Sequence, residues 1–143
     1  MCVSRFEGEA RDHRAKLFYT FEDFYQRILV AGIICDVVLD GSFLTEKPKP
    51  GDVDVKVYID VEAHERLSDE QFAQYIAMSD PNYIAGVDST AWVTYPRGHE
   101  CFGCALDPRN RGEDFGLENS ETWLKGYVVL MPGETNVGVR FRS

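Results

Sequence analysis

One strictly alternating segment constrains the fold of this chain most. From Val53 to Ile59 every second residue is a valine or isoleucine, and Asp52, Asp54, Lys56 and Tyr58 fall on the opposite parity. Successive side chains of a β-strand point to opposite faces, so this pattern predicts a strand with one face in the core. The carboxylates of Asp52 and Asp54 are then expected to project from the same, polar face.

The flanking segments predict an α/β (α+β) fold. Helical periodicity behind a capping signal predicts a helix from Thr20 to Gly32, and a capping box at Ser68 and Gln71 predicts a second helix that ends by Asp80. Runs rich in β-branched and aromatic residues predict further strands at Ile33–Leu39, Val87–Tyr95, Tyr127–Met131 and Val137–Phe141. We therefore expect a single domain with a mixed β-sheet and flanking helices, whose last two strands form a hairpin.

The length of 143 residues and a hydrophobic content of 44% suffice for one packed core. Residues 1–16 are charged and poor in apolar side chains, so we expect a flexible or surface-draped segment there and the domain at 17–143. No apolar run approaches the roughly 20 residues that span a bilayer, and the polar start lacks a signal-peptide core. With only four unevenly spaced cysteines, the expectation is a cytoplasmic protein without membrane association.

The charge balance limits the partners. The chain has 24 Asp and Glu against 15 Lys and Arg, which gives a formal net charge of -9. Such a surface disfavours nonspecific nucleic-acid binding, because that binding depends on neutralising phosphates with basic side chains. Acidic residues gathered around divalent cations are still compatible with a phosphate-containing substrate.

The most informative motif is Gly41-Ser42, followed after nine residues by Asp52-Val53-Asp54. A turn with glycine lets backbone N–H groups approach a phosphate closely, and the Ser42 hydroxyl adds a donor. Two carboxylates at i and i+2 of a strand suit hard cations such as Mg²⁺. Each half alone is also typical of an ordinary turn or a solvated strand edge, but together they indicate phosphoryl or nucleotidyl transfer.

This motif resembles a known signature. The strings Asp40–Thr45 and Lys47–Val55 resemble the signature of the polymerase β-like nucleotidyltransferase superfamily, and more closely a family of small bacterial and phage nucleotidyltransferase-like proteins. Trp123–Leu130 is similar to the Lys-Gly-then-strand ending of that family, so the likeness runs from about Phe21 to Leu130. The resemblance implies a nucleotidyltransferase-like domain that uses Mg²⁺ or Mn²⁺ to move a nucleoside monophosphate from a nucleoside triphosphate, such as ATP, to a hydroxyl of RNA, protein or a small molecule.

The resemblance also implies roles for individual residues. Gly41 and Ser42 would contact the triphosphate, and Asp52 and Asp54 would ligate the metal. The superfamily adds a third carboxylate from a later strand, which orients the metals and helps to deprotonate the acceptor; Asp88 is the best-placed candidate, although a simple turn aspartate is an equal interpretation. Lys56 would touch a phosphate or pair with the neighbouring carboxylates.

Two alternatives stay open. The chain has no room for the helical domain that many active members of the superfamily append, which favours a catalytically inactive fold that acts as a binding or regulatory partner, such as an antitoxin, an inhibitor or a phage regulator. His99, Cys101 and Cys104 supply half of a zinc site, but the remaining cysteines and histidines are scattered. Buried or loop cysteines are the simpler interpretation.

Overall fold

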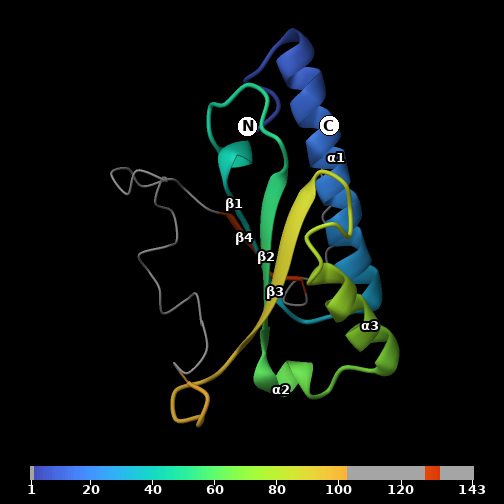
Figure 1. Ribbon diagram of the computed structural model, residues 1–143, viewed down its shortest axis with the longest axis vertical. Helices are drawn as coiled ribbons and strands as arrows, with labels where there is room; N and C mark the ends of the chain where they lie inside the picture. The colour runs from blue at the N-terminus through green and yellow to red at the C-terminus, as the bar shows by residue number, and fades with distance from the viewer. Residues whose placement is uncertain (1, 103–127, 133–143) are drawn as a thin grey trace.

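The computed structural model describes residues 2–102 and 128–132. They form a mixed β-sheet with helices on one face (Figure 1). The elements are α1 (Gly8–Ala31), β1 (Asp36–Asp40), the 3-10 turn η1 (Ser42–Leu44), β2 (Val53–Asp60), α2 (Val61–His64), α3 (Asp69–Met78), β3 (Val87–Thr94) and β4 (Val128–Leu130). This arrangement confirms the expected mixed sheet with flanking helices in one small domain.

The sheet has the strand order β3-β2-β1-β4. β1 pairs antiparallel with β2 and with β4, whereas β2 and β3 are parallel. Parallel neighbours need a crossover connection, and the segment with α2 and α3 supplies it. β2 therefore lies between a strand that precedes it and a strand that follows it, and all three bring polar residues to the same face.

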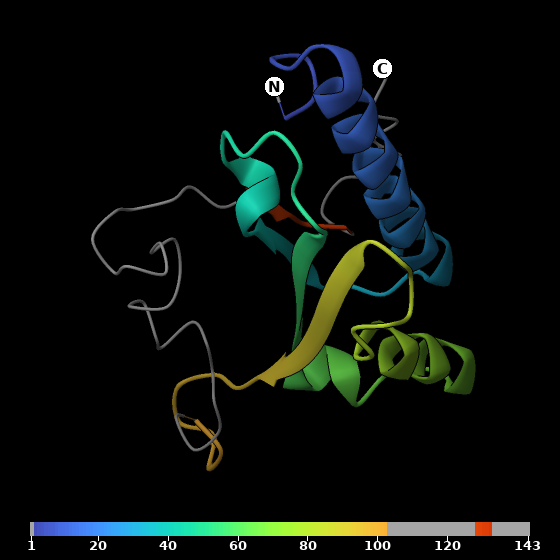
Figure 2. The same cartoon turned by 45° about the horizontal axis from the view of Figure 1, so that its top comes forward.

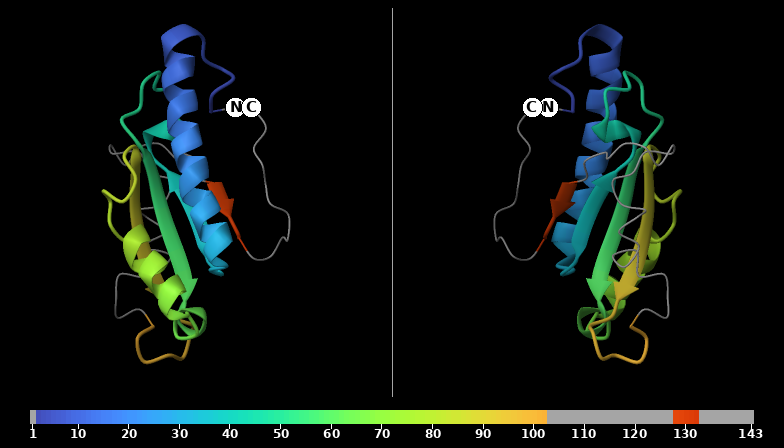
Figure 3. Two further views of the ribbon diagram at one scale, coloured as in Figure 1. Left: turned by 90° about the vertical axis from the view of Figure 1, so that its right-hand side faces the viewer. Right: turned by 90° about the vertical axis from the view of Figure 1, so that its left-hand side faces the viewer.

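The hydrophobic core lies between the sheet and α1. Val53, Val55 and Val57 of β2 are almost completely buried, as are Phe24 and Ile28 of α1. Figure 3 shows α1 and α3 in front of the sheet in one view and behind it in the opposite view, so both helices cover the same face. The alternation in β2 thus points the valines to the helices and the residues of opposite parity to the other face.

Helix α1 begins at Gly8, well before the predicted start at Thr20. The Thr20 hydroxyl does not cap a helix but donates to the carbonyl of Lys16, one turn earlier, at 2.9 Å. Residues 8–16 are therefore helical, and Arg14 is fully buried, where the sequence led us to expect a flexible or surface-draped segment. The predicted end is confirmed: Gly32 has a φ of 68° and caps the helix in the left-handed conformation.

The other predicted elements lie close to their expected positions. The capping box of α3 is present, with the Gln71 N–H donating to the Ser68 hydroxyl at 3.2 Å and the Ser68 N–H to the Gln71 side chain at 3.0 Å. β1 starts at Asp36, later than the predicted Ile33. β4 falls within the first predicted hairpin strand, while Val137–Phe141 lies outside the described residues. No helix in the described ranges is long and apolar enough to cross a membrane.

Candidate functional site

A row of three aspartates crosses the sheet. In the strand register Asp40 of β1 is the partner of Asp54 of β2, and Asp54 is the partner of Asp88 of β3. Register partners project from the same face of a sheet, and this face is opposite to α1 and α3. The structure thus aligns two predicted site residues, Asp54 and Asp88, and adds Asp40, which the sequence interpretation did not include.

The aspartates of this site differ in exposure. Asp88 is exposed, and Asp54 and Asp52 are half-buried, with Asp52 lying directly before the first residue of β2. Asp40 is only 7% exposed, and its Oδ1 atom is buried without a hydrogen-bond partner among the described residues. A buried carboxylate oxygen without a partner is costly, so it requires an explanation in the function or the packing.

Gly41 joins the two halves of the sequence motif. Its φ is 77°, a conformation that residues with a Cβ rarely adopt, and a Cβ there would lie 1.6 Å from Oδ2 of Asp54. The carboxylate of Asp54 therefore occupies the space of the missing side chain. Gly41 and Asp54, which come from the two halves of the motif, are therefore in contact.

The loop between these two halves is anchored by Arg14. Its guanidinium donates to the carbonyls of Cys2 and Lys47, both at 2.5 Å, and to that of Phe43. It also lies over the ring of Phe6, 4.2 Å from the centroid. Figure 2 shows the loop after η1 beside the N-terminal segment that these bonds attach to it. Burial lowers the pKa of Arg14, but a guanidinium stays protonated in proteins.

A shallow pocket of about 400 Å³ opens beside Asp52 and Asp88. Its other walls are Gly51 and the α3–β3 connection from Pro81 to Val87. The pocket therefore has room for a second molecule at the β3 side of the site, beside a ligand held at the aspartate row.

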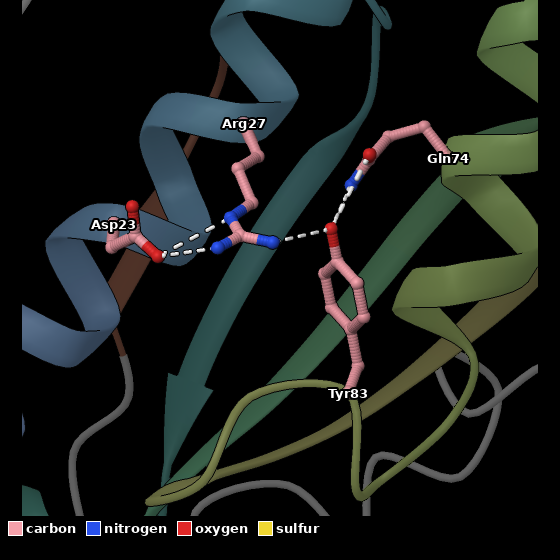
Figure 4. Close-up of polar contacts among 4 residues, drawn as sticks. All are labelled: Asp23, Arg27, Gln74 and Tyr83. Atoms are coloured by element: carbon pink, nitrogen blue, oxygen red, sulfur yellow. Dashed lines mark hydrogen bonds and ion pairs between the residues drawn. The ribbon is translucent and has the colours of Figure 1, made fainter.

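Tyr83 ties the α3–β3 connection to both helices (Figure 4). Its hydroxyl accepts from Arg27 of α1 at 2.9 Å and from the Gln74 amide of α3 at 3.3 Å, and Arg27 pairs with Asp23 at 2.9 Å. Burial alone would raise the pKa of Tyr83, but the hydrogen bonds from Arg27 and Gln74 bring it below its ordinary value. This network positions the loop that lines the pocket.

A model of one protein family matches residues 1–128, which include every residue of the site described above. The chain belongs to the family of unknown function DUF6932. No curated protein and no solved structure gives a significant match.

The carboxylates of the DUF6932 site have the donor chemistry that Mg²⁺ or Mn²⁺ prefers. In the described ranges no three histidine, cysteine or acidic side chains are grouped closely enough to hold a metal by themselves. Mg²⁺ usually keeps several waters and binds one or two carboxylates together with substrate phosphates, so a protein cage of three ligands is not required. The neighbouring carboxylates and the Asp40 oxygen, which has no hydrogen-bond partner in the described part of the chain, fit a cation that arrives with a phosphate ligand.

Lys56 lies on the same face of β2 as Asp54, one register row away. Its register partners are Val38 of β1 and Thr90 of β3. Cys101 is a free thiol, and its backbone N–H donates to Nδ1 of His99 at 3.0 Å. Cys104 lies outside the described residues, so the zinc hypothesis stays a prediction. Burial raises the pKa of Cys35 to about 12, which disfavours it as a thiolate ligand.

Proposed function

We propose that this chain binds a nucleoside triphosphate with Mg²⁺ or Mn²⁺ and transfers the nucleoside monophosphate to a hydroxyl group. The observation that carries the proposal is the contact between Gly41 and Asp54, because it joins a glycine-serine turn and a pair of strand carboxylates in one site. A phosphate-binding turn beside metal-binding carboxylates is what nucleotidyl transfer requires. The resemblance of Asp40–Val55 to the polymerase β-like superfamily supports the same reaction.

The roles follow from position. The Ser42 hydroxyl and the turn that it begins bind the triphosphate, and Asp52 and Asp54 hold the cation. When bound, the cation offsets the charge that develops on the α-phosphate and on the leaving pyrophosphate. Asp88 lies in the same row and lines the pocket, so it orients the acceptor hydroxyl and accepts its proton. Lys56 adds a positive charge on the same face.

Calorimetric titration with each nucleoside triphosphate, with and without Mg²⁺, tests the binding step. We expect Mg²⁺-dependent binding by the wild type and its loss in the double variant Asp52→Asn/Asp54→Asn. Asp60→Asn is the matched control, because Asp60 is an exposed carboxylate at the other end of the same strand. Unchanged binding in the double variant would place the nucleotide elsewhere.

A second candidate is a nucleotidyltransferase-like fold that binds a partner without turnover. The exposure of Asp88, the candidate third carboxylate, favours it, because a carboxylate that orients an acceptor must be held in one position. Labelled nucleotide distinguishes the two functions. Transfer of label to an acceptor supports the enzyme, whereas nucleotide binding without transfer, together with a stable complex with a partner protein, supports the regulatory role.

A further inference from the structure

Asp40 carries one of the buried polar atoms that lack a hydrogen-bond partner among the described residues. It is the last residue of β1, directly before Gly41, and only 7% of its surface is exposed. Its Oδ1 atom has no hydrogen-bond partner in the part of the chain that the structure describes. In solved proteins nearly all buried polar side-chain atoms are paired, so the orphan oxygen indicates a missing partner.

The neighbours of Asp40 identify the kind of partner. Its register partner is Asp54, and directly opposed residues of an antiparallel pair have Cβ atoms about 4.5–5.5 Å apart. Two carboxylates at that separation disfavour each other when both are ionised. A neutral ligand satisfies one hydrogen bond but leaves the repulsion, whereas a divalent cation removes both problems.

The distance between the two strands suits a shared cation. Mg²⁺ takes oxygen ligands at about 2.0–2.1 Å, so two carboxylates on opposed Cβ atoms reach one ion from either side. Because Gly41 has no side chain, the Asp54 carboxylate leans toward the end of β1. This is the end of the strand where Asp40 lies.

We propose that Asp40 is a ligand of the divalent cation, which lies between β1 and β2 and bridges Asp40 and Asp54. This cation is the same one that the proposed function requires. Its binding by Asp40 does not depend on nucleotide transfer. The cation then lies across two strands rather than along β2 alone, with water and the substrate phosphates completing the shell.

Mn²⁺ alone, without nucleotide, is the probe. The free ion is measured by electron paramagnetic resonance during titration of the full chain. We expect Asp40→Asn to weaken Mn²⁺ binding at least about tenfold, because the amide is a poorer ligand and carries no charge. Asp36→Asn is the matched control, since Asp36 lies on the same strand and the same face at the opposite end, and its affinity should equal that of the wild type.

Thermal unfolding in a chelator gives an independent result. If Asp40 is kept for the cation, its replacement by asparagine removes a buried, repelled charge, so the Tm of the metal-free protein should stay equal or rise. The Mn²⁺-dependent increase in Tm should shrink. A lower metal-free Tm with unchanged Mn²⁺ affinity would show a purely structural role and overturn the proposal.

Two further outcomes keep the test decisive. If Asp40→Asn does not fold, the carboxyl carbon signals of the wild type replace it: Mg²⁺ should shift the signals of Asp40 and Asp54 and leave that of Asp36 unchanged. A shift at Asp54 without one at Asp40, or no Mn²⁺ binding by the wild type, contradicts the proposal. Asp40-dependent Mn²⁺ binding without any nucleotide binding would support the cation site and reject the transferase.

Discussion

The guanidinium of Arg14 donates a hydrogen bond to the backbone carbonyl of Phe43, from the first helix to the turn at the centre of the candidate site. The same group lies 5.0 Å from the centroid of the Phe43 ring, so one side chain fixes both the backbone and the side chain of that residue. No ion pair of Arg14 occurs among the described residues; its partners there are backbone carbonyls and aromatic rings. The helix therefore sets the position of the turn.

Replacement of Arg14 should destabilise the fold strongly. Arg14→Met leaves three backbone carbonyls without their donor, so we expect a loss of about 3 kcal/mol or more in the free energy of unfolding, measured by urea denaturation. Arg14→Lys should recover part of this loss. Arg11→Met is the control, because Arg11 is exposed in the same helix. Equal stability of the two methionine variants would show that the anchor is unimportant.

A methyl group at position 41 should disrupt the site. Gly41→Ala must adopt a strained φ and displace the Asp54 carboxylate, so we expect a stability loss of about 1–3 kcal/mol and the loss of Mg²⁺-dependent nucleotide binding. Gly98→Ala is the matched control, because Gly98 also has a positive φ but nothing lies within 4 Å of a Cβ there. Combining Gly41→Ala with Asp54→Ala should cost less than the sum of the single variants; strict additivity would argue against the contact.

The Tyr83 network should stabilise the pocket loop modestly. Tyr83→Phe removes the hydroxyl that accepts from Arg27 and Gln74, and we expect a loss of about 0.5–1.5 kcal/mol by urea denaturation. Limited proteolysis should show faster cleavage between residues 80 and 86. Tyr19→Phe, at a half-exposed position of α1, serves as the reference. Identical proteolysis of the wild type and Tyr83→Phe would mean that the loop is held by its backbone alone.

Cys35 should make the protein sensitive to alkaline pH. Burial raises its pKa from 9.0 to about 12, so the neutral thiol is favoured in the fold. The stability from this group is complete below pH 9 and is lost as the pH rises toward 12. By pH 10 the loss is roughly 1 kcal/mol, because one pKa unit corresponds to an energy of that order. Cys35→Ala should flatten the decline between pH 8 and 10 in denaturant titrations; an unchanged slope would assign it to other groups.

How well the sequence predicts each element of this fold depends on how far apart in the sequence the interacting residues lie. The strand at Val53–Ile59 and the capping box at Ser68 are local patterns, and both were predicted correctly. The first half of α1 was missed because its burial comes from Arg14, a charged residue whose partners are 12 to 33 positions away in the sequence. A search for periodic apolar residues does not find a buried charged residue of this kind.

The candidate site was predictable to the same extent. Gly41, Ser42, Asp52 and Asp54 form one short sequence motif, and the structure brings Gly41 and Asp54 into contact. Asp88 was uncertain because its alignment with Asp54 depends on the parallel pairing of β2 and β3, which no local pattern specifies. Asp40 was missed because its significance arises only from the register of β1 with β2 and from its burial.

The antiparallel pairing of β1 and β2 also has a kinetic consequence. These strands are neighbours in the sequence, so their ladder closes a short loop, whereas β3 joins β2 only after the α2 and α3 crossover has formed. Local contacts form faster than distant ones because less chain entropy is lost on closure. Folding should thus bring Asp40, Gly41 and Asp54 together early and add Asp88 late, so the row of aspartates is complete only when β3 pairs with β2.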